Sequence, residues 1–283
     1  MLLIASLLFS IVTAANAQMR VFTPADMEKG IVCDKQRFRV AYEMTFVVDT
    51  TRTPYIPEKE TMILQIGKST SLFFSYPSFR SDSILNDDFA KNASQATINE
   101  HLSHVDCGRI YWSLYKNYPK KGTFTLLDAI GMDRYSCTES LKLPEWKIIA
   151  DSTKTILGYS CHLATAIYKG RKWSAWYAED IPLSEGPWKL CGLPGLILSA
   201  YDAQHQYIFA ANGMEQIKGD ENIFYKGAKF EPINKEMLNK IYIRYNADPL
   251  GYMNSNPNHH VTVTDKDGNP TKPSPIAYNP IER

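Results

Sequence analysis

The stretch ILGYSCHLATAIYKGRKWSAWYA, residues 156–178, decides the predicted fold. Lys169-Gly170 lies inside it, and a glycine in such a dipeptide favours the tight turn of a β-hairpin. The residues on both sides are rich in β-branched and aromatic side chains, which favour strands. We therefore predict two antiparallel strands, Ile156–Lys169 and Arg171–Ala178, joined by a short turn.

Similar strand patterns occur on both sides of this hairpin. A second hairpin is predicted after it, with strands at residues 196–201 and 207–211. Apolar and polar residues alternate along residues 37–48, as in a strand with one wet face. Further strands are predicted at residues 61–66, 71–76, 109–115 and 122–127. Short polar turns between consecutive strands predict an antiparallel meander.

A few segments lack the two-residue period of strands. Residues 82–104 fit a helical or irregular segment, with Asp82 or Ser83 as a candidate cap. Residues 236–244 fit a short helix, and a tail rich in Pro and Asn begins at about residue 247. The predicted fold class is therefore α+β: a large curved antiparallel β-sheet, meander or half-barrel-like, with a few covering helices.

The N-terminal residues resemble a signal peptide. Residues 2–12 form an almost continuous apolar run, shorter than the ~20 residues that a membrane-spanning helix needs. Ala15-Asn16-Ala17 follows with small residues at the positions that a signal peptidase reads. We expect cleavage near Ala17 and a periplasmic or secreted mature chain. Residues 18–283 then form a single domain with no transmembrane segment.

Charge and cysteine content narrow the functional classes. The net charge of +1 argues against a nucleic-acid partner that would need a broad basic surface. Export would place the five cysteines in an oxidising compartment, where disulfides persist. They are Cys33, Cys107, Cys137, Cys161 and Cys191. The odd number leaves at least one unpaired within the chain, and the connectivity stays open because spacing does not define it.

The motif that identifies the chain lies between the two predicted hairpins. Residues Gly192, Leu193, Pro194, Gly195, Leu196 and Ile197 spell GLPGLI. Its flanks add Gly158-Tyr159-Ser160-Cys161, the segment from Gly170 to Tyr177, and Gly186-Pro187. In these features the chain resembles the GLPGLI family of exported Gram-negative proteins, most densely over residues 158–202. The resemblance implies no reaction, because the family has no established activity.

The motif has the composition of a rigid turn that leads into a core strand. Gly192 and Gly195 permit positive φ and close backbone approach, and Pro194 has a restricted φ. We favour this structural role over a ligand-binding loop. A phosphate loop is excluded because no Lys-Ser or Lys-Thr pair follows the glycines.

Few residues form a recognisable catalytic or metal-binding pattern. His101 and His104 share a helix face near Asp106 and Cys107, but the H-E-x-x-H arrangement is missing. Cys161 and His162 are adjacent in a strand and point to opposite faces. The chain also lacks a G-x-S-x-G nucleophile motif. We therefore predict no catalytic residue, no metal site and no cofactor.

Aromatic residues give the candidate binding surface. Trp173, Trp176, Tyr177 and Trp188 lie close together in sequence. Ordinary core packing is the favoured interpretation. The functional alternative is an apolar groove on a curved sheet that receives a lipid, a peptide or a partner protein.

Three functions remain open at this stage. The first is a non-enzymatic envelope protein that binds an apolar ligand or works beside an outer-membrane transport protein. The second is a hydrolase whose site is assembled from dispersed residues. The third is a structural interaction module with a large exposed apolar patch. We rank them in that order.

Overall fold

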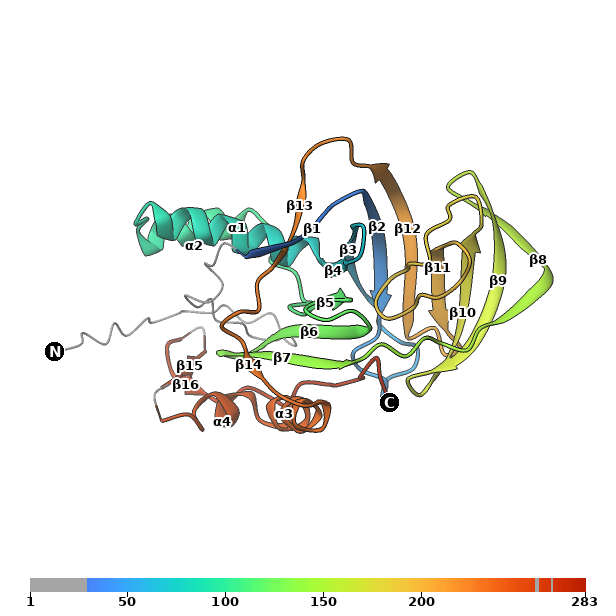
Figure 1. Cartoon of the computed structure of the whole chain (residues 1–283). Helices are drawn as coiled ribbons and strands as arrows, with labels where there is room; N and C mark the ends of the chain where they lie inside the picture. Colours follow the sequence, from blue (N-terminus) through green and yellow to red (C-terminus); the bar gives the residue numbers. More distant parts are fainter. Residues whose placement is uncertain (1–29, 258–259, 266) are drawn as a thin grey trace.

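The computed structural model describes residues 30–257, 260–265 and 267–283, and an open twelve-stranded sheet dominates it (Figure 1). Every neighbouring pair of strands in this sheet is antiparallel except β14 and β7. The two edge strands, β14 and β8, do not pair with each other in the described part of the chain. The predicted large antiparallel sheet with few helices, an α+β fold, is confirmed in this broad form.

The sheet consists of two meanders that join through one pair of strands. The first contains β2 (Phe38–Phe46), β3 (Glu58–Ile66), β4 (Ser71–Ser75), β5 (Ser113–Lys116), β6 (Thr123–Ile130) and β7 (Asp133–Ser140), with β14 (Glu231–Pro232) at its edge. The second contains β8 (Lys147–Ile156), β9 (Tyr159–Tyr168), β10 (Arg171–Ala178), β11 (Leu196–Asp202) and β12 (Tyr207–Gln216). The pairing of β2 with β12 makes them one sheet.

Each face of the sheet has its own cover. We call the face that carries Tyr42, Phe73 and Phe209 the inner face, since these rings contact one another there. Helices α3 (Lys235–Ala247) and α4 (Pro249–Met253) pack on this face at β6 and β7. Helix α1 (Tyr76–Ala90), followed by α2 (Gln95–Ser103), lies on the opposite, outer face, as Figure 1 shows.

A two-stranded ribbon also covers the outer face. It consists of β1 (Ile31–Lys35) and β13 (Asn222–Tyr225), and Ile223 packs against Leu72, Tyr115 and Leu127 of the sheet. A second small hairpin, β15 (Val263–Thr264) with β16 (Pro270–Thr271), follows α4 in the tail.

The sequence patterns predicted most strands and misplaced one helix start. The central hairpin is present as β9 and β10, with Lys169 and Gly170 both at positive φ in its turn. The predicted strand at residue 156 is interrupted by a turn at Leu157-Gly158, which separates β8 from β9. Helix α1 begins at Tyr76 rather than near Asp82, because the Ser75 hydroxyl accepts the Ser78 amide hydrogen and caps it.

The structure bears on one of two expectations about export. The predicted signal peptide, residues 1–17, lies outside the described residues. The expected disulfides are not found: all five cysteines are free thiols, distributed over β1, β7, β9 and two loops. A disulfide requires Cα atoms within about 7 Å, which these positions do not provide. None of the helices described is both long and apolar enough to cross a membrane.

Candidate ligand pocket

The GLPGLI motif forms a turn that leads into a core strand on the inner face. Gly192 has a φ of +94°, a conformation that disfavours side chains. A Cβ atom on Gly195 would lie 2.0 Å from the carbonyl oxygen of Ala178, so only glycine fits there. Leu196 and Ile197 then begin β11 and are fully buried.

Ionic contacts hold the loop before the motif against the sheet. The Lys116 Nζ atom, buried on β5, lies 2.7 Å from Glu185 Oε2 and donates to the Gly186 carbonyl at 2.8 Å. Lys189 forms ion pairs with Glu139 and Glu282. The chain itself therefore fills this part of the inner face.

The C-terminal residues fill the neighbouring part of the inner face. The Arg171 side chain is fully buried and lies 2.7 Å from the equally buried Asp202 carboxylate. The same guanidinium donates to the side-chain oxygen of Asn279 and to the carbonyls of Pro280 and Ile281. These contacts anchor residues 279–281 to the sheet.

The four aromatic residues predicted for binding occupy two different places. Trp173 and Trp188 lie together in the core, with ring centroids 5.7 Å apart, and Tyr177 is buried in the same core cluster. Trp188 also borders a small cavity of about 170 Å³ beside α3. Trp176 pairs with Leu163 on the outer face, under the Lys154 amine. A binding role for these residues stays a prediction.

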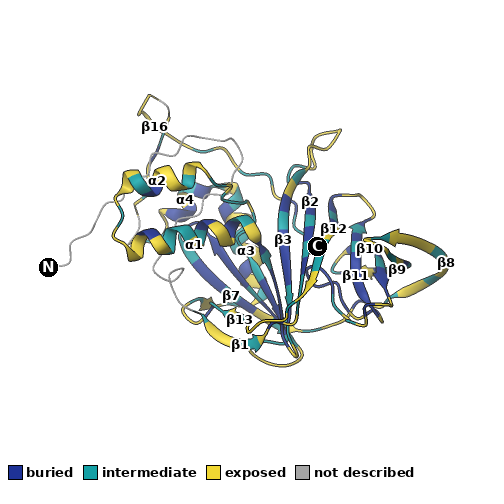
Figure 2. Cartoon of the chain, turned by 90° about the horizontal axis from the view of Figure 1, so that it is seen from above, coloured by how far each residue is buried: buried dark blue, intermediate teal, exposed yellow. Residues whose placement is uncertain are grey.

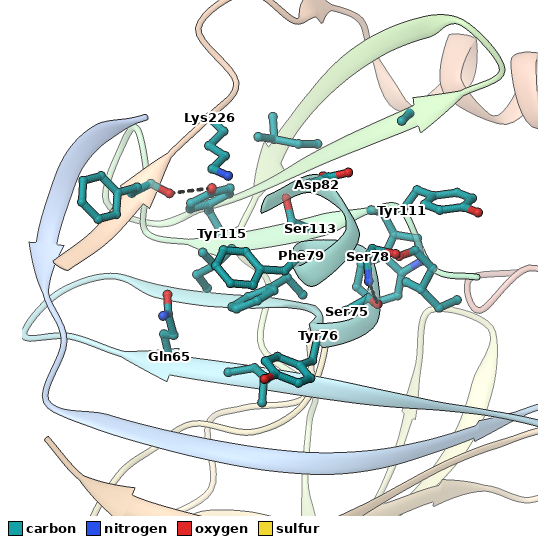
Figure 3. A pocket seen from close by; sticks show the side chains of 18 of the residues that line it. Gln65, Ser75, Tyr76, Ser78, Phe79, Asp82, Tyr111, Ser113, Tyr115 and Lys226 are labelled. Atoms are coloured by element: carbon teal, nitrogen blue, oxygen red, sulfur yellow. Dashed lines mark hydrogen bonds between the residues drawn. The ribbon is translucent and has the colours of Figure 1, made fainter. Parts of the chain in front are cut away.

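A larger cavity, of about 470 Å³, lies on the outer face, and we call it the outer pocket (Figure 3). Two adjacent cross-strand rows form its floor. One row runs from Arg39 through Gln65 and Leu72 to Tyr115, and the other from Ile63 through Phe74 and Ser113 to Leu127. Its volume falls within the roughly 300–1,000 Å³ typical of small-molecule sites.

Helix α1 and strand β13 form the opposite wall of the outer pocket. Phe79 of α1 packs on Phe74 of the floor, with ring centroids 5.5 Å apart. Phe224 of β13 lines the same cavity, and Lys226 follows directly after that strand. Phe79 is 46% exposed and Phe224 is 42% exposed. These two rings therefore leave apolar surface open to solvent at the edge of the cavity.

Most polar groups near the outer pocket are already engaged in the fold. The Tyr115 hydroxyl donates to the Phe224 carbonyl at 2.8 Å, and burial raises the pKa of Tyr115 well above its ordinary value. The Gln65 amide, in the floor, has no hydrogen-bond partner among the described residues, and Figure 3 shows it separate from the other labelled side chains. Gln65 therefore offers both a donor and an acceptor to a ligand.

A buried carboxylate beneath the pocket organises its edge. Glu60 accepts a hydrogen bond from the Ser75 hydroxyl and another from the Arg109 amide at 3.1 Å. Burial raises the pKa of Glu60. Among the residues that the structure describes, no histidine lines the outer pocket. We interpret Glu60 as a group that ties the chain before β5 to the start of α1.

The histidine cluster considered for metal binding lies between α1 and α2. His101 Nδ1 is 2.9 Å from the Asp88 carboxylate, and His104 borders the same open hollow. Across the described residues, no three His, Cys, Asp or Glu side chains are grouped so that they could hold a metal ion.

The local sequence patterns did not predict the residues of the outer pocket. A signal exists in β4, whose sequence SLFFS is apolar on both faces and therefore indicates a second covered surface. Nothing in the local sequence connects this strand with Phe224 or Lys226, which lie about half of the chain away.

A comparison with known protein families matches a short part of the chain. Residues 167–199 match the family described as "Protein of unknown function (Porph_ging)". A search of curated proteins gives no match. Two crystal forms of PNGF-II, in space groups P21 and C2, are similar at 15% and 14% identity, with TM-scores of 0.49 and 0.48. Each alignment covers 75% of this chain but 34% and 33% of PNGF-II. This likeness is too weak to support a functional argument.

Proposed function

We propose that this chain is an exported, non-enzymatic binding protein of the GLPGLI family that holds an apolar small molecule in the outer pocket. The motif at residues 192–197 supports the family, and the match over residues 167–199 to a family of unknown function is compatible with it. The signal-like residues 1–17 support export to the periplasm or beyond.

The proposal rests on one observation: the cavity is apolar, and aromatic side chains in its wall remain partly exposed to solvent. Phe74, Leu72 and Ile63 give the floor an apolar surface. Phe79 and Phe224 remain partly exposed beside it. Covering these rings with a ligand would remove apolar surface from water, which favours binding by roughly 25 cal/mol per Å² before the costs of association.

Saturation binding of N-phenyl-1-naphthylamine, an uncharged apolar fluorescent probe, tests this proposal on the full chain. We expect saturable binding. The substitution Ser113→Phe places a ring between Phe74 and Leu127, and it should weaken binding by about tenfold or more because it fills the cavity.

Ser174→Phe is the matched control, since Ser174 is a half-buried strand residue on β10 outside the outer pocket. Both variants should keep the wild-type circular dichroism spectrum. Equal loss of binding in both variants, or none in either, would argue against the outer pocket as the ligand site.

A second candidate function is that of an accessory protein that docks on an acidic partner, such as an outer-membrane transport protein. The outer face of β8–β10 supports it, because none of the described helices packs there and Figure 2 shows β8 largely exposed. Ile167 is 81% exposed beside Lys172. Lys147, Lys154 and Lys172 form no ion pair with any residue that the structure describes.

Site-specific photo-crosslinking in cells tests this second function. A crosslinker at Ile167 should capture a defined partner, and changing the three lysines to glutamate should abolish the product through charge repulsion. A crosslinker at Met237, exposed on α3, is the control. If both positions give the same products, the outer face of β8–β10 has no dedicated partner.

A further inference from the structure

One cation of the outer pocket has no carboxylate partner in the part of the chain that the structure describes. Arg39, at one end of the floor, forms ion pairs with Glu215 at 2.7 Å and with Glu221. Lys226, at the other end, has no carboxylate partner among the described residues. Its Nζ atom lies 5.5 Å from the centre of the Phe79 ring.

The position of Lys226 places its charge where a ligand head group would sit. Figure 3 shows the side chain reaching from the end of β13 toward Tyr115 and Phe79, with its amino group on the pocket side. The contact of an exposed cation with an aromatic face is weaker than a charge-assisted hydrogen bond to an anion. Lys226 can therefore exchange its contact with Phe79 for a ligand anion without leaving a buried charge.

The remaining charges in the pocket limit which anion fits. Asp82 of α1 also lines the outer pocket and already takes part in another interaction. Its negative charge would repel a doubly charged phosphate more strongly than a singly charged group. Lys226 offers a compact point charge with three donors, which suits a single small anionic group.

We infer that the outer pocket binds a single-chain amphiphile with a carboxylate head, of the fatty-acid class. This inference rests on the proposed function of the same pocket. The carboxylate pairs with Lys226 Nζ, and the alkyl chain lies along Phe74, Leu72 and Ile63 of the floor. Gln65 remains available to a polar group further along the ligand.

Competition between four twelve-carbon probes tests the inference on the full chain. Dodecanoate, dodecanol, dodecylamine and dodecyl phosphate share one chain and differ in head group. Each is titrated against bound N-phenyl-1-naphthylamine below its micellar concentration. We expect dodecanoate to bind about tenfold more tightly than dodecanol, and both more tightly than dodecylamine.

The variant Lys226→Met removes the charge and keeps the aliphatic cover of Phe79. It should abolish the preference for dodecanoate and leave the affinity for dodecanol unchanged. Lys218→Met, an exposed lysine outside the outer pocket, is the matched control and should retain the preference.

The outcomes separate this inference from the function on which it rests. Equal binding of dodecanoate and dodecanol, unchanged by Lys226→Met, would overturn the carboxylate inference while the apolar pocket stands. Tightest binding of dodecylamine or of dodecyl phosphate would overturn it as well. If none of the four displaces the probe and the probe itself does not bind, the proposed function fails together with the inference.

Discussion

The inner face and the outer pocket lie on the same strands, but the chain covers the first more completely than the second. Phe73 and Phe74 are neighbours in β4, and one is fully buried on the inner face while the other lines the outer pocket. On the inner face the chain supplies its own cover, through the segment around Trp188 and residues 279–281. On the outer face the cover is incomplete, and a cavity remains between α1 and β13.

This difference separates residues that hold the fold from residues available for function. A side chain that the fold has already covered contributes to stability, and its loss leaves a void or an unpaired charge. A side chain beside a cavity contributes less to stability and more to any ligand. Mutations on the two faces should therefore change different measurements.

Gly195→Ala should have the largest effect on the inner face. The new Cβ atom would lie 2.0 Å from the Ala178 carbonyl oxygen, so the backbone between β10 and β11 must move. We expect a loss of about 4 kcal/mol or more in the free energy of unfolding, measured by urea denaturation. Gly213→Ala is the control, because no described atom beyond its own chain neighbours lies within 4 Å of its Cβ position. A small effect at Gly195 would mean that the turn is not rigid.

Arg171→Met should be the next largest effect. It leaves the fully buried Asp202 carboxylate without its cation and releases residues 279–281. Breaking such a pair from one side costs about 3 kcal/mol or more in the free energy of unfolding. Lys59→Met breaks an exposed pair with Glu43 and should shift the urea midpoint little. Equal shifts in both variants would contradict the anchoring role of Arg171.

Phe73→Ala and Phe74→Ala compare the two faces directly. Phe73→Ala opens a cavity in the inner core and should cost about 3–5 kcal/mol in the free energy of unfolding. Phe74→Ala should cost about 2 kcal/mol less, because its ring already borders a cavity. The affinity for N-phenyl-1-naphthylamine should fall in Phe74→Ala and persist in Phe73→Ala at temperatures where both variants are folded. The reverse pattern would place the ligand on the inner face.

The smallest effect concerns the dependence of stability on pH. Burial by itself would raise the pKa of Glu139 and Glu282. The ammonium groups of Lys189 and Lys169, joined by Lys235 at Glu282, together outweigh burial, so both pKa values lie below the ordinary value. The stabilisation is therefore complete above the pKa of the unfolded chain and is lost as the pH falls through the folded pKa. Urea midpoints measured from pH 7 to pH 3 should decrease accordingly.

Lys189→Met sharpens this test, because it removes the cation with the strongest attraction to both carboxylates. Its urea midpoint should fall less steeply with decreasing pH than that of the wild type. Lys240→Met, which breaks an exposed pair with Glu236, should keep the wild-type slope. Parallel slopes for all three proteins would show that Lys189 does not control this pH dependence.

The strands could be predicted from the sequence where one face is buried and the other is exposed to solvent. Residues 37–48 alternate cleanly, and β2 lies within them. Strand β8 was missed before residue 156 because, at the edge of the sheet, it is exposed on both sides and has no alternation. Strand β13 was also missed, since its four residues are too few to show a period. The helix α1 was placed too late because Ser75 also ends a strand.

The sequence by itself determined the antiparallel sheet, its central hairpin and the need for glycine at the motif, since these depend on local periodicity and backbone conformation. The tertiary structure alone decided which apolar surface is covered and which stays open. The outer pocket combines β2–β6, α1 and the segment after β13, from Arg39 to Phe230. A two-residue period shows that a strand has an apolar face, but it contains no information about the segment that will pack on that face, because that contact forms between residues far apart in the chain.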